Sequence, residues 1–178
     1  MEERKGIVTK GARPVTLVGP EIKVGQKAPD FRLIGIDWEE AELSQSKGKV
    51  RLISVVHSLD TPVCELQTQR FEDEAKKYRD VRNVEFYTIS MDLPFAQARY
   101  FNAHGIKHLR FLSDFRDASF GKAYGLFIKE QHLLSRAVFV IDENDIVQYV
   151  EYVKEIGDQP DYNKAIKALQ NLLSVKVK

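Results

Sequence analysis

The segment RLISVVHSLDTPVCEL, residues 51–66, contains Cys64, the only cysteine among 178 residues. Apolar and β-branched residues dominate positions 52–56, and a segment with helical periodicity begins near Thr61. This change of pattern predicts a strand that enters a helix through a short turn, with Cys64 at the helix N-terminus. Unpaired backbone N–H groups and the helix dipole favour an anion there, and a thiolate is such an anion. The alternative is that Cys64 is a small buried hydrophobic residue.

Strand and helix patterns alternate on both sides of this segment. Strands are expected at residues 6–9, 15–18, 31–34, 51–56, 84–89, 110–112, 137–141 and 146–153, and helices at residues 61–78, 94–105, 118–124 and 160–173. Residues 142–145 are expected to form the four-residue loop of an antiparallel hairpin. The order predicts a single α/β domain over residues 1–178, with a mixed central sheet and helices on both faces. The tail that holds Lys176 and Lys178 is expected to be frayed.

The first long helix carries an apolar stripe that includes the cysteine. Cys64, Phe71, Ala75 and Tyr78 recur at helical spacing, so we expect them to share the inward face. That placement suits either a core residue or a shallow pocket at Cys64.

The charge balance and the cysteine count exclude several classes of protein. The chain has 27 basic and 26 acidic residues and no basic stripe interleaved with aromatic residues, so we expect no nucleic-acid partner. One cysteine cannot form an intramolecular disulfide. The charged start, Met1 to Lys5, leads into no signal-peptide core, and no run approaches the ~20 apolar residues of a membrane span. We therefore expect a cytoplasmic protein with no membrane partner.

Two patterns resemble metal sites only in part. His104 and His108 are four residues apart, but Gly105 is expected to break the helix between them, and no acidic cluster completes a site. Residues 142–145 are acidic but lack the glycine and the terminal glutamate of a calcium loop, so we interpret them as a turn. We expect no metal ion and no dissociable cofactor.

Thr61-Pro62-Val63-Cys64 at a strand-to-helix turn resembles the Thr-x-x-Cys peroxidatic site of the peroxiredoxins. The strings SLDTPVC (residues 58–64), DLPFAQ (92–97) and RAVFVIDE (136–143) are similar to motifs of the thiol peroxidase subfamily, the atypical two-cysteine peroxiredoxins. GARPVTL (11–17) and APDF (28–31) resemble its amino-terminal region. The resemblance spans nearly the whole chain. It implies a thioredoxin-like fold of the peroxiredoxin type with an N-terminal β-hairpin, a homodimer, and a preference for organic hydroperoxides.

The resemblance assigns roles to three residues. Cys64 is implied as the thiolate that attacks peroxide, and Arg136, matched through the motif alone, as the guanidinium beside it. A guanidinium offers fixed charge and directed N–H groups to the charge that develops on the peroxide oxygens. Thr61, one helical turn before Cys64, can hold its hydroxyl beside the sulfur. The alternatives are that Thr61 only caps the helix and that Arg136 only forms a surface salt bridge.

The chain departs from the family pattern at two positions. The usual motif is Pro-x-x-x-Thr-x-x-Cys, and His57 occupies the position of its proline. An imidazole there could bind the substrate, add positive charge or fill space, and the alternative is a hydrogen-bonded bystander. Phe101 occupies the position of the resolving cysteine, so the sulfenic acid on Cys64 must be reduced by an outside molecule.

We therefore expect a thiol-dependent peroxidase that reduces hydrogen peroxide and organic hydroperoxides through a Cys64 sulfenic acid, in a one-cysteine cycle. Its reductant would be thioredoxin or a small-molecule thiol. Two alternatives remain open. The first is a peroxiredoxin-like redox sensor that has lost turnover, which the changes at His57 and Phe101 would suit. The second is a thioredoxin-fold binding module in which Cys64 is inert.

Overall fold

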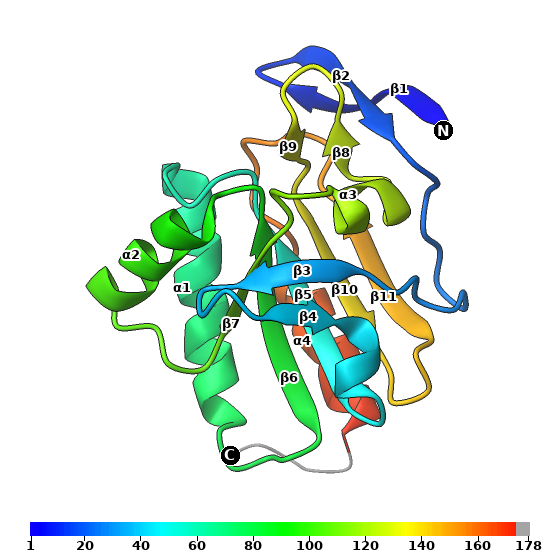
Figure 1. The fold of residues 1–178 in the computed structure, drawn as a ribbon. Coiled ribbons are helices and arrows are strands. Elements are labelled where there is room, and N and C mark those ends of the chain that lie inside the picture. Colours follow the sequence, from blue (N-terminus) through cyan, green and yellow to red (C-terminus); the bar gives the residue numbers. More distant parts are fainter. Residues whose placement is uncertain (174–178) are drawn as a thin grey trace.

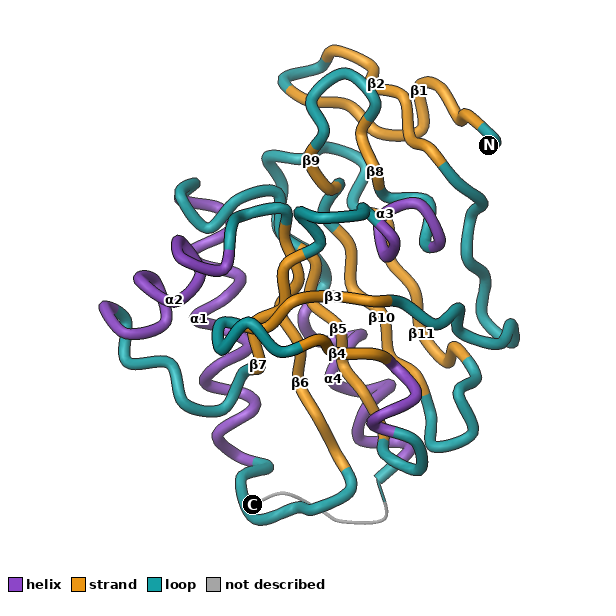
Figure 2. The backbone as a smooth tube through the Cα atoms, viewed as in Figure 1, coloured by secondary structure: helices purple, strands orange, loops and turns teal. Residues whose placement is uncertain are grey.

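The computed structural model describes residues 1–173, and it has the expected mixed α/β architecture (Figures 1 and 2). Its central sheet is made of β3 (Arg32–Gly35), β4 (Glu40–Glu42), β5 (Val50–Val55), β6 (Val84–Ser90), β7 (Arg110–Ser113), β10 (Ala137–Ile141) and β11 (Val147–Tyr152). The strand order across this sheet is β11-β10-β5-β6-β7-β3-β4. Strands β5, β6 and β7 are parallel to each other, and the other pairs are antiparallel. The prediction of a mixed sheet is confirmed.

A smaller sheet lies at one end of the molecule, at the top of Figure 1. Its strands are β1 (Glu3–Lys10), β2 (Arg13–Val18), β8 (Phe127–Ile128) and β9 (Leu133–Leu134), in the order β1-β2-β8-β9. Strands β1 and β2 form the expected N-terminal hairpin. The turn between them is Gly11–Ala12, because Lys10 pairs with Arg13 and Pro14 already belongs to β2.

Helices cover both faces of the central sheet. They are α1 (Pro62–Lys77), α2 (Pro94–Ala103), α3 (Ser119–Ala123) and α4 (Tyr162–Leu172), together with the 3₁₀ helix η1 (Leu43–Ser46). Residues from α1, α2 and α4 share one buried apolar cluster with Leu52 and Val138, whereas Phe120 of α3 belongs to the other cluster with Ile53 and Phe139. Successive residues of β5 and β10 therefore point alternately into the two clusters, because side chains alternate between the two faces of a pleated sheet.

Strand β5 and the turn after it position the cysteine. All six residues of β5 are buried, as is usual for a central strand covered on both faces. The chain then turns through residues 56–61 into α1. The expected apolar stripe is buried: it consists of Cys64, Phe71 and Ala75 in α1 and of Tyr78, the C-cap residue of this helix. Helix α1 begins at Pro62, where a proline costs nothing because the first N–H groups lack helical partners.

The differences from the sequence-based prediction are local. The strands β4, β8 and β9 and the helix η1 were not predicted, because segments of two to four residues are too short to show a period. Helix α2 ends at Ala103, before Gly105, which adopts a φ of +63°. The tail with Lys176 and Lys178 lies outside the described residues. Within residues 1–173, no helix is long and apolar enough to cross a membrane.

Candidate active site

Cys64 lies in the first turn of α1 and its side chain is completely buried. Two donors lie close to the sulfur: Arg136 Nη2 at 3.3 Å and the backbone N–H of Ser58 at 3.5 Å. Both would stabilise negative charge on the sulfur. The side chain belongs to the apolar cluster that also contains Val56 and Tyr100, so the thiol combines an apolar surrounding with one cationic neighbour.

Arg136 precedes β10 and is 1% exposed, so it is not a surface residue. Its guanidinium uses neutral acceptors: Nε and Nη2 donate to the Ile156 carbonyl at 3.0 and 2.9 Å, and Nη1 donates to Gln67 Oε1 at 2.7 Å. Among the described residues, no carboxylate forms a salt bridge with Arg136. The surface salt bridge that we considered for this residue is therefore excluded. Its positive charge is directed instead at the sulfur of Cys64.

Gln67 was missed by the sequence analysis, although it belongs to the same group of contacts. It lies three residues after Cys64 on the buried face of α1, and its amide N–H₂ donates to Ser54 Oγ at 2.8 Å. Because that bond fixes the amide orientation, Oε1 faces Arg136. A glutamine on the apolar stripe of a helix was the available signal, since a buried amide needs partners.

Thr61 is the N-cap residue of α1, but its side chain does not cap the helix. The hydroxyl donates to the Ser58 carbonyl at 2.9 Å, so its proton is already used. We expected the hydroxyl beside the sulfur, yet its hydrogen bond is to the turn before the helix. Its oxygen lone pairs are what Thr61 can offer to a molecule that enters the site.

His57 is buried in the turn after β5, and both of its ring nitrogens have partners. Nδ1 lies 3.0 Å from the Leu134 carbonyl and therefore carries the proton, because a carbonyl can only accept. Nε2 then accepts from Lys10 Nζ at 3.2 Å. Burial lowers the pKa of His57, and the charges of Lys10 and Arg136 act in the same direction. This geometry fits the hydrogen-bonded alternative better than direct binding of a substrate.

Asp92, the first residue of the DLPFAQ string, fixes the turn that carries the Ser58 donor. Its carboxylate accepts from Ser58 Oγ at 2.8 Å, from the Leu59 N–H at 2.9 Å and from Ser90 Oγ at 2.7 Å. These bonds tie the turn after β5 to the end of β6. Sequence reasoning used this string only as a resemblance, because only the fold brings Asp92 next to Ser58.

Phe101 lies on α2 and packs edge-to-face on Phe111 of β7, with ring centroids 5.6 Å apart. Its neighbour Tyr100 belongs to the buried cluster of Cys64, and burial raises the pKa of Tyr100 while the charge of Cys64 acts in the same direction. Helix α2 is also joined to α1 through His104 Nε2, which is 3.1 Å from Glu65 Oε1. His108 is paired with Glu72 in the same way at 2.8 Å, so the two histidines bind different carboxylates.

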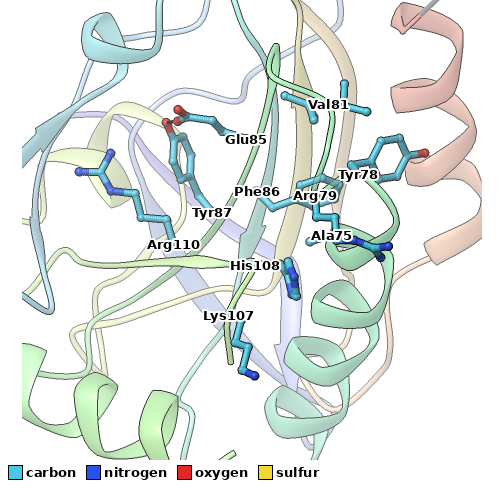
Figure 3. Close-up of a pocket in the computed structure, with 11 residues that line it drawn as sticks. Ala75, Tyr78, Arg79, Val81, Glu85, Phe86, Tyr87, Lys107, His108 and Arg110 are labelled. Carbon is cyan, nitrogen blue, oxygen red and sulfur yellow. Dashed lines mark hydrogen bonds between the residues drawn. The ribbon is translucent and has the colours of Figure 1, made fainter. Parts of the chain in front are cut away.

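A groove with a volume of about 340 Å³ lies far from this site, between the C-terminal end of α1 and β6 (Figure 3). Its walls include Ala75, Tyr78, Phe86, His108 and Arg110. Ala75 is about three helical turns from Cys64 on the same helix. The groove therefore does not belong to the contacts around the cysteine.

Known proteins resemble the chain over nearly its whole length. Residues 23–166 match the Redoxin family. The thiol peroxidase of Bacillus subtilis (strain 168) is 55% identical over 167 residues, covering 94% of this chain and 98% of the relative. That of Halalkalibacterium halodurans is 52% identical over 166 residues, covering 93% of this chain and 98% of the relative. A peroxiredoxin-like protein from Aquifex aeolicus superposes with a TM-score of 0.87 at 36% identity, covering 97% of this chain and 100% of that one.

These similarities include the segment that carries Cys64 and the segment that carries Arg136, since both lie inside the Redoxin match. The chain therefore belongs to the Redoxin family and, within it, to the thiol peroxidases.

Proposed function

We propose that this thiol-dependent peroxidase works through Cys64 in a one-cysteine cycle, with Arg136 and Thr61 at the reacting atoms. The observation that carries the proposal is the 3.3 Å contact between Arg136 Nη2 and Cys64 Sγ in a buried site. The other acceptors of the guanidinium are the Ile156 carbonyl and the Gln67 amide oxygen, which are both neutral. A fixed cation in such a place stabilises an anion strongly, because little solvent screens it.

In the first step the Cys64 thiolate attacks one peroxide oxygen and the O–O bond breaks. The sulfur is oxidised to sulfenic acid, and the other oxygen leaves as hydroxide or alkoxide and takes up a proton to give water or an alcohol. Arg136 stabilises the charge that develops on the leaving oxygen. Thr61 accepts a hydrogen bond from the peroxide O–H, because its own proton is held by the Ser58 carbonyl.

In the second step an outside thiol attacks the sulfenic sulfur, releases water and forms a mixed disulfide. A second thiol then releases the Cys64 thiolate and leaves as the oxidised disulfide. The single cysteine of the chain supports this cycle, because no other thiol is available within it. Cys64 is fully buried, so the first turn of α1 must open before a bulky thiol reaches the sulfur.

Arg136→Lys tests the assignment. Lysine keeps the charge but has no planar fork of donors, so it cannot contact Ile156, Gln67 and the sulfur together. We expect the rate constant for oxidation of Cys64 by cumene hydroperoxide to fall about 10- to 1000-fold, as for the loss of one oxyanion donor. Quenched-flow with mass spectrometry measures it. Arg110→Lys, in the groove of Figure 3, is the matched control and should react at the wild-type rate. Equal rates for all three proteins would contradict the role of Arg136.

The same assay separates the enzyme from its alternatives. Continued peroxide consumption with thioredoxin or dithiothreitol supports a turning-over peroxidase. Fast oxidation that no thiol reverses supports a redox sensor, and unreactive Cys64 supports a binding module. Thioredoxin and small thiols should be compared at equal concentrations, because the proposal covers both.

A homodimer and a cytoplasmic location also belong to this proposal. An aromatic cluster of the exposed Trp38 and Phe95 with the half-buried Phe115 offers apolar surface for self-association. Phe95 is 69% exposed, and its ring centroid lies 4.9 Å from that of Trp38. Reduction by thiols requires a reducing compartment, which favours the cytoplasm. Light scattering on a size-exclusion column tests the dimer, and cell fractionation tests the location.

A further inference from the structure

One backbone carbonyl accepts from two of the three guanidinium nitrogens of Arg136. Ile156 O accepts from both Nε and Nη2, and the same Nη2 lies 3.3 Å from Cys64 Sγ. The opposite side is held by Gln67, which belongs to α1 like the cysteine itself. Any displacement of the Ile156 carbonyl would therefore move the guanidinium relative to the sulfur.

Ile156 lies in the segment after β11, and the tip of the N-terminal hairpin holds that segment. The Thr9 N–H donates to the Lys154 carbonyl at 2.7 Å, and the Ile156 N–H donates to the Thr9 carbonyl at 2.9 Å. Thr9 and Glu155 thus form an isolated parallel bridge. Ile156, which presents its carbonyl to Arg136, is therefore held through its own N–H by Thr9, a residue of the smaller sheet.

The carboxylate of Glu155 joins the hairpin tip to the segment after β11. It accepts from Thr9 Oγ1 at 2.6 Å, from the N–H groups of Gly11 and Ala12 at 2.9 and 3.2 Å, and from the Gly157 N–H at 3.3 Å. Ala12 has a φ of +64°, a left-handed conformation that is unfavourable for alanine. The hydrogen bond from its N–H to Glu155 helps to stabilise this strained turn. These bonds, that of Thr9 foremost, lower the pKa of Glu155 to about 2, so it is ionised at any ordinary pH.

The same hairpin tip reaches the other side of the site. Lys10 Nζ contacts His57 Nε2 at 3.2 Å, and His57 immediately precedes Ser58, whose N–H is the second donor near the sulfur. His57 Nδ1 donates to the carbonyl of Leu134, two residues before Arg136. Both groups that contact Cys64 are therefore joined to residues 9–12.

We propose that Glu155 is a positioning residue of the peroxidase: by fastening the hairpin tip to residues 154–157, it holds the Ile156 carbonyl, and through it Arg136, against Cys64. The inference rests on the proposed role of Arg136. The competing interpretation is that Glu155 only stabilises the fold. In that case its loss would lower the unfolding temperature and leave the peroxide reaction unchanged.

Glu155→Gln tests the inference, and Glu130→Gln is its matched control. Glu130 also binds the hairpin, because both of its oxygens accept from the Thr16 N–H at 3.0 Å, but among residues 1–173 it forms no hydrogen bond or salt bridge with the 154–157 segment. For Glu155→Gln we expect the rate constant of Cys64 oxidation by cumene hydroperoxide to fall about 10-fold, as misplacement of a catalytic group does. For Glu130→Gln we expect a rate within about twofold of wild type.

A double-mutant cycle with Arg136→Lys gives a readout that a purely structural role would not move. If Glu155 acts through Arg136, Glu155→Gln should slow Arg136→Lys by much less than it slows the wild type. Multiplicative effects, or a folded Glu155→Gln that reacts as fast as wild type, would overturn the inference. If Glu155→Gln does not fold, Thr9→Val removes one donor to the carboxylate and must show the same coupling with Arg136→Lys. A wild-type rate for Arg136→Lys alone would instead refute the proposed role of Arg136.

Discussion

Arg136 shows how a single residue can supply the electrostatics of this site. Its guanidinium is buried against a carbonyl and an amide, and no described carboxylate neutralises it. A buried cation without an anionic partner is costly, so the site favours an anion in the remaining position. The sulfur of Cys64 lies at that position, and the leaving oxygen of a bound peroxide would carry its charge close to the same guanidinium. The cost of burying the arginine is thus partly relieved when negative charge appears beside it.

His57 is expected to make folding sensitive to acid. Burial lowers its pKa in the folded protein, whereas the unfolded chain has the ordinary value of about 6.5. Below that pH the unfolded chain binds the proton first, so the free energy of unfolding falls as the pH falls towards the folded pKa, by at most about 1.4 kcal/mol per pH unit. The loss ends below the folded pKa, where both states are protonated.

His57→Pro restores the residue of the family motif and removes this titration. Urea unfolding at a series of pH values should show a shallower loss of stability on the acid side of about pH 6.5 for the variant than for the wild type. His132→Asn is the control, because His132 is exposed and its ring lies against Phe127. Parallel stability curves for wild type and His57→Pro would show that His57 is already protonated or freely solvated.

Protonation of His57 should also slow the peroxide reaction, because it would remove the acceptor of Lys10 and place two cations together. The charges that face the ring are Lys10 from β1, Arg136 before β10 and Asp92 after β6, and only Asp92 opposes the two cations. Because burial lowers the pKa of His57, we expect this loss of rate on the acid side of about pH 6.5, the ordinary value of a histidine.

Helix α2 is the element in which this chain differs most in chemistry from two-cysteine enzymes. Phe101 packs on Phe111 of β7, and it lies against the same apolar cluster that contains Tyr100 and Cys64. A cysteine at position 101 would therefore begin beside Phe111, and we expect α2 to move to bring its sulfur into the geometry of a disulfide with Cys64. Loss of the aromatic contact would also loosen the helix, because the ring is removed from a partly buried position.

Phe101→Cys is expected to divert the oxidised enzyme into an internal disulfide. One equivalent of peroxide should leave a protein that has lost two hydrogens, and thioredoxin should reverse the change. The matched control is Phe95→Cys on the same helix, whose side chain is 69% exposed in the wild type and should give no internal disulfide. A Phe101→Cys protein that accumulates sulfinic acid at the wild-type rate would mean that α2 does not move on the timescale of overoxidation.

Across the whole molecule, the strands and helices with a clear apolar periodicity were predictable from the sequence, and the tertiary contacts between them were not. The strand at residues 51–56 and the helix at 61–78 were expected within one residue of β5 and α1, because apolar periodicity and Pro62 define them. Arg136 could be matched only by resemblance, since no local pattern distinguishes it from other arginines. Gln67, Ile156 and Glu155 were missed because their roles depend on contacts between segments that are far apart in the chain.

Because the chain has a single cysteine, the oxidised form of Cys64 has no thiol within the molecule to react with. Without a second thiol in the chain, a sulfenic acid on Cys64 persists until an outside thiol arrives, and a second peroxide can carry it to sulfinic acid. Excess cumene hydroperoxide without thiol should therefore add two oxygens to the intact mass, whereas Cys64→Ser should gain none. Because Cys64 is fully buried, two sulfurs from different molecules cannot meet unless α1 opens. A covalent dimer through Cys64 as the main product would show that this opening is faster than overoxidation and that resolution is intermolecular.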